Sequence, residues 1–144
     1  MSPSPAVTTD LAHDLRLATM RLGRRLRQQR ADHGLPLGQL SVLATLPRLG
    51  PLTPGALAHH EQVQPPSMTK VLANLADAGY VDRTPDPTDG RQQVVSLTDS
   101  ARTLLHEDRR RRDEWLAEHL LALTAEERAV LSAALPVLEV LADS

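Results

Sequence analysis

The sequence contains no cysteine and no phenylalanine, and it has only one tryptophan and one tyrosine. Without cysteine the chain has no disulfide framework, no thiolate ligand for a metal and no cysteine redox chemistry. The scarcity of aromatic residues means that the core must be built mainly from leucine, valine and alanine. Because leucine and alanine are strong helix formers, this composition favours a mainly helical fold.

Long hydrophobic runs are also absent. No stretch reaches the roughly 18 consecutive apolar residues of a membrane span, and residues 1–9 lack the charged-then-apolar pattern of a secretion signal. We therefore expect residues 1–9 to form a flexible tail on a cytoplasmic protein that has no membrane partner. The 144 residues, of which 41% are hydrophobic and 24% charged, are typical of one globular domain.

Catalytic and metal-binding patterns are missing as well. The sequence has no glycine-rich phosphate loop and no Cys–His pair for nucleophilic catalysis. The histidines are scattered along the chain, and no tight cluster of histidine and glutamate is visible. We expect each of them to be an isolated surface residue: His13, His33, His59, His60, His106 and His119. The sequence therefore predicts no enzyme activity, no cofactor and no metal site.

The segment 53–63 has the signals of a short helix followed by a tight turn. Thr53 is a good N-cap, and Pro54 occupies the first helical position, where a missing N–H costs nothing. Leu57 and Ala58 give the helix an inward face, and Val63 is expected to be the apolar plug of the turn.

A second helix begins at Pro65 and Pro66, because proline is tolerated in a first helical turn but not in a helix interior. Gly79 ends this helix as a left-handed cap. Its buried face should consist of Met68, Val71, Leu72 and Leu75, which follow the spacing of a helix. Its exposed face should consist of Gln64, Ser67, Thr69, Lys70 and Asn74. Such short polar side chains with one cation suit base edges and phosphates in a major groove, although any amphipathic helix has a polar outer face.

A β-hairpin is predicted directly behind these two helices. Residues 80–84 resemble a strand, residues 85–91 are dense in turn formers, and residues 92–97 form the returning strand. A hairpin in this position makes a winged helix. Arg91 at its tip is placed to enter a minor groove or to contact a phosphate.

Two segments resemble the MarR family, the multiple-antibiotic-resistance regulators. Residues 57–69 (LAHHEQVQPPSMT) resemble the family's helix-turn-helix, and residues 86–91 (DPTDGR) resemble its wing, with the Asp-x-Arg pattern at Asp89 and Arg91. The resemblance extends over residues 10–142. It implies a homodimeric winged-helix transcriptional regulator, usually a repressor that a small ligand releases from DNA. The family's thiol-sensing mode is excluded because the chain has no cysteine.

The expected DNA contacts combine the exposed helix face with the wing. They are Gln64, Pro65, Ser67, Met68, Thr69, Lys70, Asn74, Arg83, Asp89 and Arg91, together with Gln39, whose amide at the start of an earlier helix is placed to hold a phosphate. Gln64 departs from the family, which often has serine there. Because glutamine is a poor N-cap, we interpret Gln64 as a base-reading residue.

Charge argues against a DNA-binding protein. The net charge is −2, and within residues 51–97 the cations Lys70, Arg83 and Arg91 are outnumbered by acids, namely Glu61, Asp77, Asp82, Asp86 and Asp89. Free amides at helix N-termini would supply some compensation. A second hypothesis therefore stays open: a helical protein-interaction module with a winged helix that does not read DNA.

The remaining segments are predicted to be helices with leucine stripes. One runs from residue 10 to about 32, one starts at residue 37, one follows Thr98, and the last opens with a capping box at Thr124 and Glu127. We expect residues 10–34 and 98–144 to form a dimerisation region around a winged helix-turn-helix at 35–97. Two recognition helices would then lie roughly 34 Å apart on a palindromic site.

The resemblance also implies a ligand pocket near Leu17, Met20, Leu46 and Trp115. Trp115, the one tryptophan of the chain, is the best candidate for a cavity wall. A small apolar or aromatic effector would fit such a lining, although all four residues are also ordinary candidates for a hydrophobic core.

Overall fold

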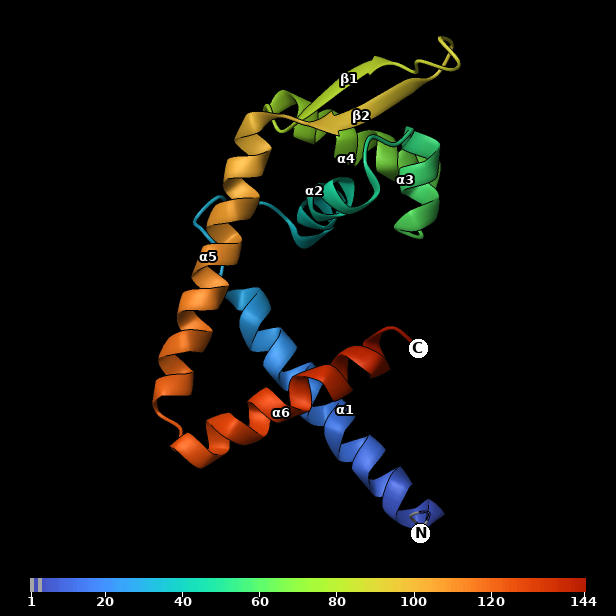
Figure 1. Ribbon diagram of the computed structural model, residues 1–144. Helices are drawn as coiled ribbons and strands as arrows, with labels where there is room; N and C mark the ends of the chain where they lie inside the picture. Colours follow the sequence, from blue (N-terminus) through green and yellow to red (C-terminus); the bar gives the residue numbers. More distant parts are fainter. Residues whose placement is uncertain (1, 3) are drawn as a thin grey trace. The chain divides into compact units, whose positions relative to one another are not determined.

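The computed structural model describes residue 2 and residues 4–144 of the chain. This part folds into helices and one two-stranded antiparallel sheet (Figure 1), so the predicted class, mainly α with a small β-hairpin, is confirmed. The elements are α1 (Pro5–Gln28), α2 (Leu37–Leu49), α3 (Pro54–His60), α4 (Pro65–Asp77), β1 (Val81–Pro85), β2 (Gln93–Leu97), α5 (Asp99–Leu121) and α6 (Ala125–Ala142). They divide between two compact units, Ala31–Arg109 and the two terminal segments Met1–Arg30 and Arg110–Ser144.

The unit Ala31–Arg109 has a continuous hydrophobic core. The core residues come from α2, α3, α4, both strands and the start of α5: Leu35, Val42, Leu43, Leu46, Leu57, Ala58, Met68, Leu72, Leu75, Val81, Val95, Leu97, Ala101 and Leu104. As the composition predicts, no aromatic side chain is among them. The hairpin of β1 and β2 extends beyond the helices of this unit (Figure 1).

The hairpin is anchored at its base. Val81 pairs with Leu97 across the two strands, and both side chains are buried. The segment before α3 joins the hairpin through Leu52, whose N–H donates to the Val95 carbonyl (3.2 Å) and whose carbonyl accepts the Val95 N–H (2.7 Å). The strand that leads back from the wing is therefore held on both edges.

Three predicted helix starts are confirmed by their caps. The Thr53 and Thr98 hydroxyl oxygens accept amides three residues further on, at 3.1 and 3.2 Å. The Thr98 hydroxyl also donates to the Gly79 carbonyl (2.6 Å), which ties the start of α5 to the end of α4. Thr124 and Glu127 form the predicted capping box of α6.

The terminal unit contains α1, α6 and the second half of α5. Trp115 is its aromatic centre: the Arg25 guanidinium lies 5.5 Å from the ring centroid, and the His119 ring stacks at 4.0 Å. Neither α1 nor α6 has a buried residue among those described. Their exposed leucines, valines and methionine are more than the surface of a monomeric soluble domain usually carries.

Several expected boundaries and orientations are wrong. α1 begins at Pro5, so residues 5–9 are helical and not a flexible tail, because Pro5 starts the helix as a first-turn proline; residues 1 and 3 lie outside the described chain. α1 also ends at Gln28, before the expected 32. Val63 is 40% exposed and does not plug the turn.

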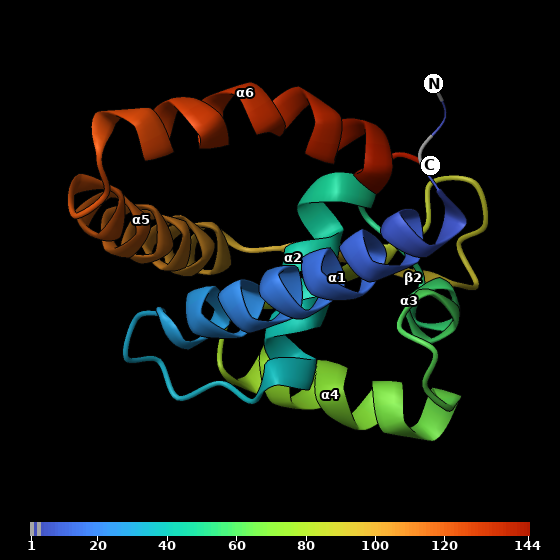
Figure 2. The same ribbon diagram turned by 90° about the horizontal axis from the view of Figure 1, so that it is seen from below.

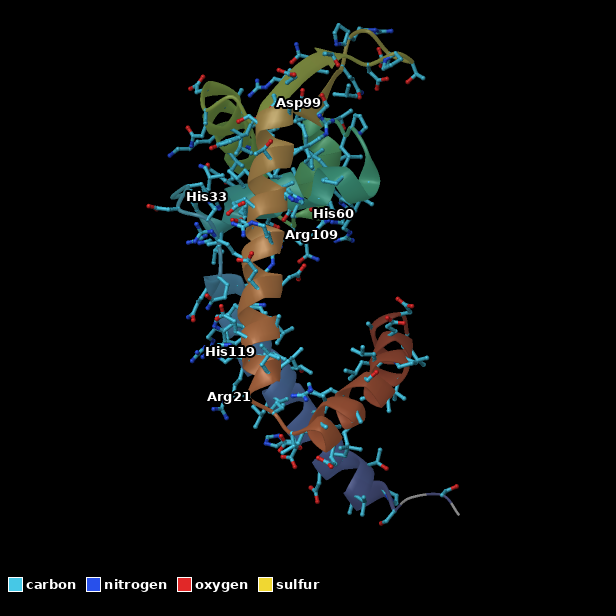
Figure 3. The ribbon with its side chains drawn as sticks, turned by 60° about the vertical axis from the view of Figure 1, so that its left-hand side comes forward. Arg21, His33, His60, Asp99, Arg109 and His119 are labelled. Atoms are coloured by element: carbon cyan, nitrogen blue, oxygen red, sulfur yellow. The ribbon has the colours of Figure 1, made fainter. Side chains whose placement is uncertain are left out.

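His33 is not the isolated surface residue that the sequence predicts. Figure 3 labels His33, whose side chain is 6% exposed. The Asp108 side chain is 1% exposed, and 2.9 Å separates His33 Nε2 from Asp108 Oδ2. The Leu35 N–H donates to His33 Nδ1 (3.1 Å), so the hydrogen is on Nε2, and Nε2 donates to the carboxylate. Asp108 also accepts the Ala31 N–H (2.7 Å). This cluster joins the first and last residues of the unit Ala31–Arg109.

Replacing Asp108 by asparagine should therefore destabilise this unit. Asparagine keeps only one of the two acceptor oxygens and places an NH2 group where the other carboxylate oxygen accepts, so one donor would face another donor. We expect a loss of about 2 kcal/mol in the free energy of unfolding. Urea unfolding followed by circular dichroism measures the change. Asp113→Asn, at an exposed position of α5, is the matched control; equal midpoints for the two variants would contradict the structural role of Asp108.

Candidate nucleic-acid interface

Helix α4 has two chemically distinct faces. Met68, Leu72 and Leu75 are at most 1% exposed and belong to the core, as their helical spacing predicts. The opposite face is solvent-exposed and carries Gln64, Ser67, Thr69, Lys70 and Asn74. The structure therefore brings together the polar side chains expected to read DNA.

Met68 is the exception among the expected contacts on this helix. Its side chain is only 1% exposed, so the prediction that it contacts DNA is wrong. The physical reason is that Met68 shares the buried face with Leu72, one helical turn further on.

The N-terminus of α4 offers few free amides. Pro65 and Pro66 have no N–H, the Met68 N–H donates to the Gln64 carbonyl (3.1 Å), and the Gln64 side chain forms no cap hydrogen bond. The Ser67 amide is left to face solvent, so helix-end compensation for the missing positive charge is smaller than expected. Because it caps nothing, the exposed Gln64 side chain remains available for a base.

Gln39 lies at the start of α2 and is half-buried. Its backbone N–H already donates to the Pro36 carbonyl (3.1 Å). The prediction that this amide holds a phosphate is therefore wrong, because the first turn of α2 is tightened onto Pro36.

A short turn joins α3 to α4 (Figure 2). Its hydrogen bonds make it a Schellman motif. The Val63 N–H donates to the Ala58 carbonyl (3.0 Å) and the Gln62 N–H to the His59 carbonyl (3.2 Å), the paired bonds that define this motif. Gln62 adopts a φ of 56°, a left-handed conformation that is unfavourable for a residue with a side chain. The turn is thus fixed but strained at Gln62.

Glu61 is a residue whose part in the turn the sequence did not reveal. Its two carboxylate oxygens accept hydrogen bonds from the Ser41 and Thr45 hydroxyls of α2, each at 2.8 Å. The four-residue spacing of Ser41 and Thr45 indicates that both hydroxyls lie on one face of α2. It does not indicate their partner, because Glu61 is 20 and 16 residues away in sequence. Glu61 therefore connects α2 to the turn that precedes α4.

The wing tip uses its own acids to shape its backbone. Asp86 Oδ1 accepts the Thr88 N–H and the Thr88 hydroxyl, each at 2.9 Å. The Thr88 N–H, followed by the hydroxyl, holds the pKa of Asp86 below its usual value. Asp89 Oδ1 likewise accepts the Arg91 N–H (3.1 Å). The Arg91 side chain itself is 97% exposed, so the tip presents a cation.

The other cations of this unit are also placed outward. Lys70 on α4 and Arg83 on β1 are exposed. The acids Asp77 and Asp82 are exposed as well, whereas Glu61 is half-buried. Three of the five acids in residues 51–97 therefore accept hydrogen bonds from protein groups: Glu61, Asp86 and Asp89. These bonds reduce the repulsion of DNA by the acids of this segment but do not remove it.

The residues expected to form a ligand pocket do not share one hollow. Leu46 is a core residue of the unit Ala31–Arg109, 3% exposed, and lines a hollow of about 390 Å³. In the terminal unit Trp115 lines a different hollow of about 230 Å³. Leu17 and Met20 lie on α1 with 41% and 51% of their surface exposed and line neither.

Two further features bear on the class of site. Within the described residues there is no group of three or more histidine, aspartate or glutamate side chains arranged to hold a metal ion. A membrane span would need a longer or more apolar helix than any found among the described residues.

Comparison with known proteins identifies the family. A MarR family model matches residues 35–92. An HTH-type transcriptional regulator of Mycobacterium tuberculosis is 51% identical over 133 residues, which cover 92% of this chain and 93% of the relative. This chain belongs to the MarR family. A Pseudomonas aeruginosa crystal structure described as a transcriptional regulator superposes with a TM-score of 0.84 at 35% identity, covering 99% of both chains.

Family membership decides between the two hypotheses drawn from the sequence. MarR-family proteins are DNA-binding transcriptional regulators and not enzymes, so the protein-interaction module is not needed to explain the fold. A more distant relative, the HTH-type transcriptional repressor MdtR of Bacillus subtilis, is 26% identical over 127 residues, covering 88% of this chain and 82% of that protein.

The strain at Gln62 in this MarR-family chain predicts a stabilising substitution. Gln62→Gly should raise the free energy of unfolding by roughly 0.5 kcal/mol, because relief of the left-handed strain exceeds the added entropy of the unfolded chain. Gly79 (φ 81°) ends α4 in the same conformation, so Gly79→Ala should change stability in the opposite direction. Chemical denaturation of the three proteins tests this; a Gln62→Gly variant less stable than the parent would show that the Gln62 side chain contributes more than the strain costs.

Proposed function

We propose that this MarR-family regulator is a homodimeric repressor that reads a palindromic operator and is released by a small ligand. One observation supports the proposal that the protein reads DNA. The polar face of α4 and Arg91 at the wing tip are both solvent-exposed, and both belong to the unit Ala31–Arg109. A major groove accepts the helix, while the wing reaches the flanking backbone or minor groove.

The proposed contacts divide into two classes. Gln64, Ser67, Thr69 and Asn74 read base edges, and Lys70, Arg83 and Arg91 contact phosphates or, for Arg91, the minor groove. Pro65 and Asp89 act indirectly: Pro65 starts the helix, and Asp89 fixes the backbone of Arg91. The Thr69 hydroxyl donates to the Pro65 carbonyl (3.0 Å), so its oxygen accepts from a base amino group.

The exposed apolar side chains of the terminal unit support the proposed dimer. Leu131, Leu135 and Leu138 form one stripe of α6 and are 44%, 56% and 36% exposed. On α1, Leu11 is 64% exposed. A second copy is the natural cover for such stripes, and two-fold symmetry matches a palindromic site.

Repression and its relief follow from occupancy of DNA. A dimer seated on promoter DNA excludes the transcription machinery, and the relative MdtR is named a repressor. A ligand that binds better to a dimer with a different spacing of its α4 helices would release the operator. The hollow of about 660 Å³ between α1 and α6, lined by Leu11, Leu15, Leu138 and Leu141 among others, supports a small apolar or aromatic ligand.

Two substitutions distinguish contacts to the DNA backbone from contacts that recognise bases. Arg91→Ala should weaken binding to all DNA sequences and reduce the slope of log affinity against log salt by about 1, because one phosphate or groove cation is lost. Gln64→Ala should instead change which base pairs are preferred. Fluorescence titrations of operator variants at two salt concentrations measure both effects. If both variants bind the upstream DNA of the gene as the parent does, these roles are wrong.

The dimer makes a separate prediction. Leu135→Glu should shift the protein toward monomers and abolish tight binding to the palindrome, because it buries a charge in the proposed interface. Sedimentation equilibrium measures the association. Ala133→Glu, which adds the same charge at an exposed position on the opposite face of α6, is the control; a dimeric Leu135→Glu variant would contradict this interface.

A further inference from the structure

We propose that Glu61 is a positioning residue for DNA recognition: by bridging two hydroxyls of α2, its carboxylate sets where the reading helix α4 begins. The inference rests on the proposed reading of an operator by α4. It adds a residue that does not contact DNA itself but controls the direction of the side chains that do.

The geometry of the contact is that of a clamp. Ser41 and Thr45 lie one turn apart on α2, and each donates its hydroxyl to a different oxygen of the Glu61 carboxylate, at 2.8 Å in both cases. Two directional bonds to one planar group restrict its rotation as well as its distance. The Thr45 residue is only 5% exposed, so water competes poorly for at least this bond.

The clamp is connected rigidly to the start of α4. Glu61 is the C-cap of α3, and only Gln62 and Val63 separate it from Gln64, the N-cap of α4. Both intervening residues are held by the Schellman hydrogen bonds to α3. A displacement of Glu61 is therefore passed on to Gln64 and to the first exposed turn of α4.

Apart from these backbone bonds, the hydrogen bonds of the described residues include no other side-chain contact from the start of α4 to another helix. Gln64 makes no cap bond, and Pro65 and Pro66 have no N–H to donate. The apolar anchors Met68 and Leu72 lie further along α4, and apolar packing is not directional. Glu61 is thus the side chain that gives the reading end of α4 a defined orientation.

The charge of Glu61 also favours this role. A carboxylate close to a DNA-binding surface repels phosphates, so it weakens non-specific binding. Its removal should therefore have two opposite effects: sequence-selective binding falls because α4 loses its orientation, and non-specific binding stays equal or rises slightly because a negative charge is gone. A residue that only stabilised the fold would not separate the two.

The test first selects an operator for the parent protein from a pool of random DNA duplexes. Affinities for the selected duplex and for a scrambled duplex are then measured for Glu61→Ala, for Ser41→Ala combined with Thr45→Val, and for all three changes together. Asp77→Asn, which removes one exposed negative charge from the end of α4, is the control. Titrations are run at a temperature where circular dichroism shows every variant folded.

We expect Glu61→Ala and the hydroxyl double variant each to lose about tenfold in the ratio of specific to non-specific affinity. The combined variant should lose no more than either, since both remove the same clamp. Asp77→Asn should leave the ratio unchanged. Equal ratios for the parent and the hydroxyl double variant would overturn the inference, and so would additive losses in the combined variant. A parent protein that selects no sequence would instead overturn the proposed function on which the inference rests.

Discussion

The burial of one face of α4 is the constraint on which the interface depends. Met68, Leu72 and Leu75 lie in the core of the unit Ala31–Arg109. Burial of each side chain contributes about 1.5–3 kcal/mol to the free energy of unfolding. A rotation of the helix by one residue, about 100°, would expose part of this set and bury Ser67 or Thr69 in its place. The packing therefore fixes which face of α4 points outward, and it leaves the placement of the first turn of α4 to the contact of Glu61 with α2.

A scarcity of positive charge shapes how this protein can use DNA. Cations do not surround the interface; instead, the acids nearest to it are engaged by Ser41, Thr45 and the wing backbone. Non-specific attraction, which comes mainly from phosphate neutralisation, must then be modest. A larger share of the affinity has to come from the fit of α4 and the wing, and this gives small errors in their placement a large effect on selectivity.

Features encoded locally were predictable from the sequence. The caps at Thr53, Thr98 and Thr124, the buried series on α4 and the hairpin all depend on residues within a few positions of one another. The start of α1 at Pro5 was missed, although a proline at the first helical position is itself a local signal.

Features encoded at long range were not predictable. The contact of His33 with Asp108 spans 75 positions, and that of Glu61 with Ser41 spans 20, so no helical or strand period connects the partners. Gln39 and Met68 failed as DNA contacts for a different reason. The Gln39 amide is used within the first turn of its own helix. For Met68, the helical spacing that predicts a buried side chain is confirmed, and the DNA contact is not.

In the proposed dimer, the terminal unit would couple folding to DNA binding. α1 and α6 bury no residue completely in one chain, so much of the apolar surface that would stabilise them becomes available only against a second copy. Association then contributes to folding as well as to symmetry, and stability depends on protein concentration. The same association would bring two α4 helices to one palindromic site. A change that weakens the contact between copies would therefore both destabilise α1 and α6 and reduce the number of α4 helices bound to each site. A ligand acting on this unit therefore needs no path to α4, since altering the association of two copies is sufficient to alter how they hold DNA.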